Sequence, residues 1–149
     1  MSIFDRFRSD EVQKQIKRLA GDGRDRDKIY SAMLALQEIG DRAVLPLIEV
    51  LLDRDRRPAL RCRATGTLAM LKDGRAVEPL ITTLSDSDVE VRWTALKALV
   101  KLGERRAVPE LERMAASDEG GFSITPELHI VMRDEARKAI EQIEAGRKQ

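Results

Sequence analysis

The chain alternates short amphipathic stretches with polar turns, and one of these stretches occurs three times. The copies are DRAVLPLIEVLLD from residue 41, DGRAVEPLITTLSD from residue 73 and ERRAVPELERM from residue 104. Their arginines, Arg42, Arg75 and Arg106, are 33 and then 31 residues apart. A repeat of this length with helical content is typical of stacked helical hairpins. The pattern therefore predicts an all-α solenoid, a fold whose function lies on its surfaces.

A second amphipathic stretch follows each copy. Its apolar residues are spaced by four and then three, as in the buried stripe of a helix. The three sets are Ala64, Leu68 and Leu71, then Ala95, Leu99 and Leu102, and then Ala136, Ile140 and Ile143. Ala32, Leu36 and Ile39 match the same positions upstream, and Ser9 is expected to cap a helix before them. We therefore expect one domain of eight helices in four hairpins. Their ranges are 9–40, 41–72, 73–103 and 104–145, after an N-terminal arm or cap at 1–8.

The repeat resembles a HEAT repeat, in the short form named after the phycobilisome lyases. The run from Asp73 to Arg92 carries this resemblance best. It implies a right-handed α-solenoid in which the second helix of each hairpin lines the concave face. It also implies a ladder in which an acid of the inter-helix turn pairs with an arginine six residues later. The candidate pairs are Asp55 with Arg61, Asp86 with Arg92, and Glu127 with Arg133.

The concave face is the candidate binding surface. A helical wheel of residues 91–104 places Trp93, Lys97 and Val100 opposite the buried stripe. The equivalent positions in the other hairpins are Tyr30, Leu34, Cys62, Gly66, Ala69, Asp134 and Lys138. Because a mid-helix glycine costs about 1 kcal/mol relative to alanine, we interpret the small residues around Gly66 as the floor of a shallow groove. The alternative is that they only let the helices pack closely, with Trp93 covering them.

Two segments depart from the repeat. The segment 117–127 is longer than its counterparts, and Gly120 and Gly121 favour flexibility there. Its apolar residues, Phe122 and Ile124, fit a segment that folds over the edge of the solenoid, contacts a partner or is loose. At the N-terminus, Ile3, Phe4 and Phe7 share one helical face. That face fits a cap on the first hairpin, an arm that docks on a second copy, or a weak membrane contact.

Patterns for catalysis and metal binding are missing from the sequence. His129 is the single histidine and Cys62 the single cysteine, so neither has the partners of a zinc site or a catalytic triad. The sequence also lacks the glycine motifs that hold phosphates. We therefore expect no enzyme activity, no metal and no cofactor.

The charge is almost balanced, with 27 basic and 26 acidic side chains. The strongest basic cluster surrounds one turn and does not follow the concave face, which argues against a track for nucleic acid. It consists of Arg54, Arg56, Arg57, Arg61 and Arg63. The single cysteine suits a reducing cytoplasm, and no apolar run is long enough to cross a bilayer.

Together these features predict a cytoplasmic, non-catalytic module that binds a peptide segment or a partner protein on its concave face. Self-association through that face or through the N-terminal arm stays open. One alternative is a small apolar ligand or a tetrapyrrole, with the lyase-like role that the resemblance implies. Another is nucleic-acid binding at the basic cluster.

Overall fold

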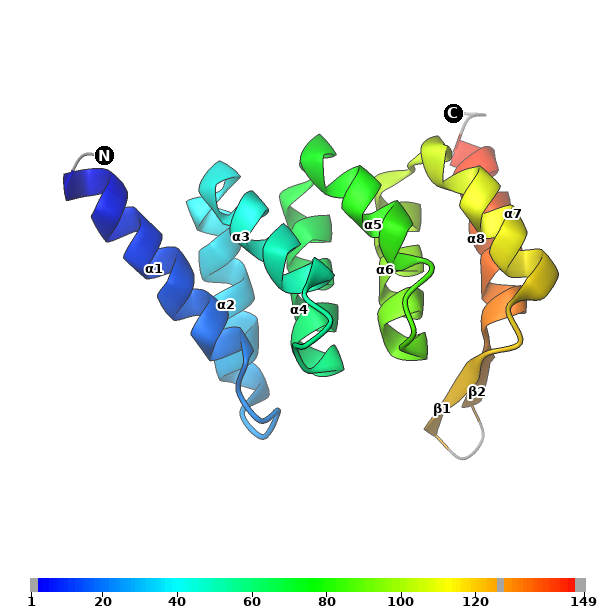
Figure 1. Ribbon diagram of the computed structural model, residues 1–149, viewed down its shortest axis with the longest axis horizontal. Helices are drawn as coiled ribbons and strands as arrows, with labels where there is room; N and C mark the ends of the chain where they lie inside the picture. The colour runs from blue at the N-terminus through cyan, green and yellow to red at the C-terminus, as the bar shows by residue number, and fades with distance from the viewer. Residues whose placement is uncertain (1–2, 126–127, 147–149) are drawn as a thin grey trace. The chain divides into compact units, whose positions relative to one another are not determined.

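The computed structural model describes residues 3–125 and 128–146, and the side chains of these residues from 10 onward (Figure 1). The chain divides into two compact units, Met1–Ala76 and Val77–Gln149. We call them unit 1 and unit 2 and describe each by itself. Each unit contains two helical hairpins, so the predicted all-α helical-repeat fold is confirmed. The grouping of all four repeats into one domain stays a prediction.

Unit 1 consists of two layers of helices. Its elements are α1 (Ile3–Leu19), α2 (Arg26–Ile39), α3 (Asp41–Leu52), α4 (Pro58–Leu71) and the short 3-10 helix η1 (Gly74–Ala76). α1 pairs with α2 and α3 pairs with α4, while α1 also packs on α3 and α2 on α4 (Figure 1). We call α1 and α3 the first-helix layer and α2 and α4 the second-helix layer.

Unit 2 repeats this arrangement and adds a β-hairpin. Its elements are α5 (Val77–Thr83), α6 (Val89–Leu102), η2 (Arg105–Ala107), α7 (Val108–Ser117), β1 (Gly121–Thr125), β2 (Leu128–Val131) and α8 (Met132–Ala145). α5 pairs with α6, α7 pairs with α8, and α6 packs on α8. In unit 2, α5 and α7 form the first-helix layer, and α6 and α8 form the second-helix layer.

The first two positions of the predicted buried stripes lie in the cores of both units, whereas Ile39, Leu71 and Leu102 at the third position are half-buried. The alanines at the first stripe position, Ala32, Ala64, Ala95 and Ala136, have no exposed surface. Leu36, Leu68 and Leu99 at the second position are equally buried, whereas Ile140 is half-buried. Side chains in a protein core pack with little free space. A small side chain at the first position therefore brings the neighbouring helices close together.

The repeated RAV sequence has two structural roles. Its alanine is fully buried in every copy, at Ala43, Ala76 and Ala107. Its arginine connects hairpins. Arg75 binds Asp73 of its own turn, with Nε 2.9 Å from Oδ1, and also binds the carboxylate of Asp41 on α3. In unit 2, Arg106 binds Glu104 in the same manner, and its Nη1 lies 3.5 Å from the Glu78 carboxylate on α5.

The start of the chain differs from its prediction. α1 begins at Ile3, so Ser9 lies inside the helix and is not its N-cap. Residues 3–8 form the first turns of α1, because the helical pattern continues upstream of Ser9. The side chains of Ile3, Phe4 and Phe7 lie outside the described side chains, and the cap and the arm both stay predictions.

The segment after α7 forms an antiparallel hairpin in place of the predicted loop. Phe122 faces Ile130 and Ser123 faces His129 across the two strands, with an irregular register between Ser123 and Thr125. The two glycines at its start, Gly120 and Gly121, are needed for close packing, not for flexibility. A Cβ atom at Gly121 would lie 2.5 Å from the carbonyl oxygen of Ile130, and one at Gly120 would overlap the Arg92 guanidinium.

Candidate binding surface

In unit 1, the second-helix layer leaves large apolar side chains in solvent. Tyr30 is 58% exposed and Leu34 is 38% exposed, both on α2. Cys62 and Gly66 on α4 are half-buried, and Ala69 is buried. The structure therefore places five of the predicted surface residues on two neighbouring helices, with the small ones deeper than the large ones.

Gly66 permits a specific contact between α2 and α4. A Cβ atom at residue 66 would lie 3.3 Å from the Cε methyl of Met33. The Met33 side chain therefore lies directly over the glycine backbone. This contact is consistent with the interpretation in which small residues let the second helices pack closely, although Met33 meets the glycine only with the end of a flexible side chain.

A hollow of about 450 Å³ lies beside Tyr30. We call it the Tyr30 hollow. It is lined by Gly23, Arg26, Ile29, Tyr30, Met33 and Arg63. Five of these residues were not among the predicted surface residues, although Arg26, Tyr30 and Met33 follow the spacing of one helical face. That spacing was the available signal, and sequence reasoning missed it because the repeat comparison began at Tyr30.

Arg63 is held in place at one side of the Tyr30 hollow. Its Nη1 donates to the carbonyl oxygens of Leu19 and Gly21, the latter at 2.7 Å, and so binds the C-terminal end of α1. Arg57 likewise donates to the carbonyl oxygen of Ala20. Arg56 pairs with Asp53 at 3.0 Å. Three arginines of the basic cluster therefore serve local structure.

In unit 2, Trp93 on α6 is half-buried by its own unit. The ring of Phe122 on β1 meets it edge-on, with the ring centroids 5.6 Å apart and an interplanar angle of 76°. The indole N–H donates to the Glu135 carboxylate on α8 at 3.2 Å. Lys97 Nζ lies 6.0 Å from the centre of the Trp93 ring. Phe122 of the β-hairpin thus packs against the ring of the predicted aromatic anchor.

Glu135 organises the charges around Trp93. Burial acts to raise the pKa of its carboxyl, but hydrogen bonds from Lys138 and Trp93, and the charges of Lys138 and Lys97, outweigh it and lower the pKa. Lys138 Nζ lies 2.9 Å from this carboxylate. The carboxylate therefore stays charged and fixes both the indole and one lysine.

The remaining predicted residues of unit 2 lie on the same layer. Val100 is half-buried on α6, while Lys97 on α6 and Asp134 and Lys138 on α8 are exposed. Ile124 on β1 is 50% exposed. The predicted groove joins Tyr30 of unit 1 to Trp93 of unit 2, so the groove as a whole stays a prediction.

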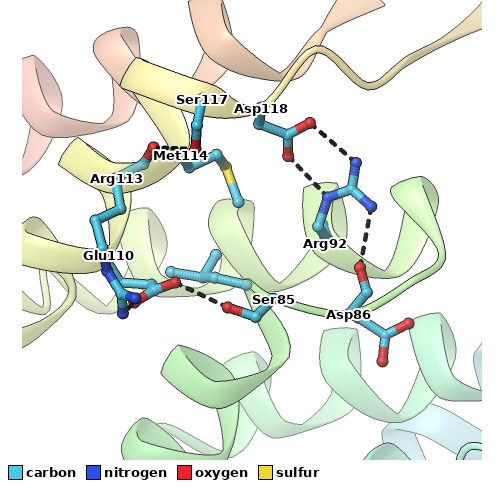
Figure 2. Close-up of a pocket in the computed structure, with 9 residues that line it drawn as sticks. Ser85, Asp86, Arg92, Glu110, Arg113, Met114, Ser117 and Asp118 are labelled. Atoms are coloured by element: carbon cyan, nitrogen blue, oxygen red, sulfur yellow. Dashed lines mark hydrogen bonds and ion pairs between the residues drawn. The ribbon is translucent and has the colours of Figure 1, made fainter.

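The arginine ladder has a different partner from the one predicted. Figure 2 shows the Arg92 guanidinium between the Asp118 carboxylate and the carbonyl oxygen of Asp86. The bonds to Asp118 measure 2.9 and 3.1 Å, and the bond to Asp86 goes to the main chain. The ladder step in unit 2 thus joins the α5–α6 hairpin to the α7–α8 hairpin. The pairing of Arg92 with the Asp86 carboxylate is corrected, because that carboxylate is directed away from the guanidinium (Figure 2).

The predicted Asp55–Arg61 pair is also placed differently, whereas the Glu127–Arg133 pair stays a prediction. Arg61 is buried and donates from Nε to the Leu51 carbonyl at 2.8 Å, while Asp55 is exposed in the turn. Glu127 lies outside the described residues. Arg133 approaches Glu119 at 3.7 Å. Arg61 and Arg92 therefore each bind a main-chain carbonyl of their own hairpin, and Arg92 also binds a carboxylate of the next hairpin.

A second hollow, of about 360 Å³, lies next to the Arg92–Asp118 pair (Figure 2). Glu110 accepts a hydrogen bond from Ser85 Oγ at 2.8 Å and also pairs with Arg113. Ser117 Oγ donates to the Arg113 carbonyl. Because these polar groups bind one another, we interpret this hollow as part of the contact between the hairpins of unit 2.

Two features are absent from the described residues. Among residues 3–125 and 128–146, no cluster of three or more His, Cys, Asp or Glu residues is placed to hold a metal ion. None of the described helices combines the length and apolar character needed to span a membrane.

The paired layers define a helical-repeat protein, and comparison with known families identifies the repeat. The family model for HEAT repeats matches residues 46–122, more than half of the chain. The chain therefore belongs to the HEAT-repeat family. The model for the PBS lyase HEAT-like repeat matches residues 29–53, which contain Tyr30 and most of α2.

One curated relative is similar to part of the chain. It is the phycocyanobilin lyase subunit alpha of Picosynechococcus sp. (strain ATCC 27264 / PCC 7002 / PR-6), which is 40% identical over 81 residues. The alignment covers 51% of this chain and 30% of that relative. The chain therefore matches less than a third of the lyase subunit.

Proposed function

We propose that this chain is a non-catalytic binding module that holds a peptide segment or a partner protein on its second-helix layers. The observation that carries the proposal is the exposure of Tyr30 and Leu34 on α2, although the core beneath them is filled. Contiguous apolar side chains in solvent are characteristic of interaction surfaces. HEAT repeats suggest the same role of a protein-interaction scaffold. We expect this role to be exercised in the cytoplasm.

Each unit contributes a different part of the proposed surface. The second-helix layer of unit 1 offers an exposed aromatic ring and the Tyr30 hollow. The second-helix layer of unit 2 offers Trp93, which Glu135 and Phe122 hold in one orientation, together with the ammonium group of Lys97. A ring that is already immobilised loses little conformational entropy on binding, which favours its use as an anchor.

The experiment is a peptide-display selection against the full chain, followed by affinity measurements on the selected peptides with matched variants. Tyr30→Ala and Leu34→Ala should each weaken binding at least fivefold. Leu45→Ala is the control, since Leu45 is 56% exposed but lies on α3 in the first-helix layer. Equal effects of Tyr30→Ala and Leu45→Ala, or a selection that yields no binding peptide, would contradict the proposal.

A second candidate is a bilin-binding, lyase-like role. Its support is the 40% identity to part of a phycocyanobilin lyase subunit. Incubation of the chain with phycocyanobilin, followed by absorption spectroscopy, separates the two roles. A shifted and intensified visible band that Tyr30→Ala abolishes would favour the bilin. An unchanged spectrum would argue against bilin binding and leave the peptide-binding module as the proposed function.

A further inference from the structure

The Tyr30 hollow combines a cationic rim with an apolar floor. Arg26 and Arg63 supply the guanidinium groups, and Ile29, Tyr30 and Met33 supply the apolar surface. Ile29 and Met33 are half-buried, so they line the hollow without closing it. Small-molecule and peptide subsites are typically built in this way, from an apolar lining with a few oriented polar groups.

Arg26 takes no part in the local ion pairs. Of the neighbouring acids, Asp22 pairs with Arg24 at 3.3 Å and Asp25 pairs with Lys28 at 2.7 Å, while Asp27, whose side chain is also described, forms no ion pair with Arg26. Among the described side chains, none forms a hydrogen bond or ion pair with Arg26. A guanidinium group presents a planar set of donors that matches both oxygens of a carboxylate. The rim is therefore complementary to a carboxylate.

The guanidinium group of Arg63 is an immobilised part of this cationic rim. Its Nη1 is held by two main-chain carbonyls of the α1–α2 connection, and its Nη2 lies 3.2 Å from the position of a Cβ atom at Gly23. Gly23 therefore leaves the Arg63 guanidinium uncovered on the side of the hollow. An immobilised cation adds attraction for an anion at little entropic cost.

We infer that the Tyr30 hollow recognises a peptide carboxylate that lies next to an apolar side chain. Arg26 binds the carboxylate, Arg63 adds its charge, and the apolar side chain packs on Ile29, Tyr30 and Met33. This inference rests on the proposed peptide-binding function and names the chemistry of its partner. A chain terminus and an internal Asp or Glu offer the same carboxylate, and the experiment distinguishes these two sources.

The test is a titration of the ¹⁵N-labelled full chain with three short acetylated peptides, followed by two-dimensional NMR. The first ends in two leucines with a free carboxylate, and the second is the same peptide with a C-terminal amide. The third is amidated and carries a glutamate before its last leucine. We expect the amide signals of Gly23, Ile29 and Met33 to shift with the first or third peptide, and far less with the second. Shifts with the first peptide alone would identify a chain terminus as the source of the carboxylate. Shifts with the third peptide alone would identify an internal acid.

Matched variants separate specific recognition from general attraction. Arg26→Gln should weaken binding about tenfold, the loss expected for one charge-assisted hydrogen-bonded pair. Arg24→Gln makes the same charge change two residues away and outside the hollow, and should alter the affinity less than twofold. Arg63 is not substituted, because its bonds to α1 make it necessary for the fold.

The outcomes distinguish this inference from the function on which it rests. Equal shifts with all three peptides, equal effects of Arg26→Gln and Arg24→Gln, or no shift at millimolar peptide would overturn the carboxylate pocket. Peptides from the display selection would then still bind in a Tyr30-dependent manner if the proposed function is correct. Failure of the selection itself would overturn the proposed function.

Discussion

Arg92 on α6 binds both carboxylate oxygens of Asp118, the residue that ends α7, at 2.9 and 3.1 Å (Figure 2). Both side chains are only 14% exposed, and Asp118 also accepts the Gly120 N–H at 2.7 Å. The pair therefore connects two hairpins and orders the first residues of the segment that leads into β1. A two-pronged pair of this kind is among the stronger polar contacts in proteins.

Replacement of Asp118 by alanine should destabilise unit 2. The substitution leaves the Arg92 guanidinium partly buried without its carboxylate and removes the acceptor for Gly120. We expect the free energy of unfolding to fall by about 2 kcal/mol. Urea denaturation followed by circular dichroism measures this change. The control is Glu119→Ala, because the Glu119 side chain is 88% exposed and should contribute less than about 0.5 kcal/mol. Similar effects of the two substitutions would contradict the role of the pair.

Alanine at residue 66 should stabilise unit 1. The new methyl group would meet the flexible end of Met33 at 3.3 Å, and that end can move by a few tenths of an ångström. The gain in helix propensity should then dominate and raise the free energy of unfolding by up to about 1 kcal/mol. Denaturant unfolding at constant pH measures the change, and a loss of stability would mean that Met33 cannot move.

The contrast to this substitution is Gly121→Ala. Its methyl group would lie 2.5 Å from the Ile130 carbonyl oxygen, a main-chain atom of the paired strand. Because the backbone cannot move without breaking the hairpin, Gly121→Ala should lower stability. The two glycine substitutions are therefore expected to have opposite signs.

Removal of the Phe122 ring should expose Trp93. The indole loses the ring packed against its edge, so Phe122→Ala should shift the tryptophan emission to longer wavelength. It should also lower the free energy of unfolding by about 2 kcal/mol. Trp93 is the single tryptophan of the chain, so its fluorescence reports on this site alone. Ile124→Ala is the control on the same strand, since Ile124 is half exposed and should leave the emission unchanged.

The Asp73–Arg75 pair predicts a specific pH dependence. Hydrogen bonds from the side chain and the backbone N–H of Arg75 lower the pKa of Asp73 from 3.8 to about 2. Because the folded pKa lies below the unfolded one, this group stabilises the fold above about pH 4 and loses that contribution as the pH falls toward 2. Arg75→Gln should raise the pKa of Asp73 toward 3.8, as measured by NMR titration of its carboxyl carbon.

Arg106→Gln provides the matched control for this titration. The side chain of Arg106 lowers the pKa of Glu104, so its removal should raise the pKa of Glu104. The same substitution should leave the pKa of Asp73 unchanged, since Arg75 is the residue that lowers it. A change at Asp73 in this variant would indicate a general unfolding effect and not a local pair.

The cores of both units could be derived from the sequence in detail. Ala64 and Leu68 lie at the predicted stripe positions and have no exposed surface. This succeeds because the period of an α-helix is set by its own hydrogen bonds and does not depend on the rest of the fold. The start of α1 was missed, because serine is a favoured N-cap residue and yet is tolerated inside a helix, where Ser9 lies.

The candidate surface was only partly predictable. The exposure of Tyr30 and Leu34 is consistent with the helical wheel, since a wheel reports which side of a helix is polar or apolar. Arg63 could not be assigned in this way, because its guanidinium contacts main-chain carbonyls more than 40 positions away in the sequence. Long side chains reach across elements, and their partners depend on how those elements pack.

The sequence by itself determined the repeat, the pairing of helices into hairpins and the residues that fill the core, because these follow from helical periodicity and from the burial of apolar side chains. Only the tertiary structure decided that Arg92 binds Asp118, that a β-hairpin brings Phe122 against Trp93, and that Arg26 and Arg63 line one hollow beside Tyr30. Each of these contacts joins residues from different elements. Their geometry depends on distances between helices, which no local pattern of residues specifies.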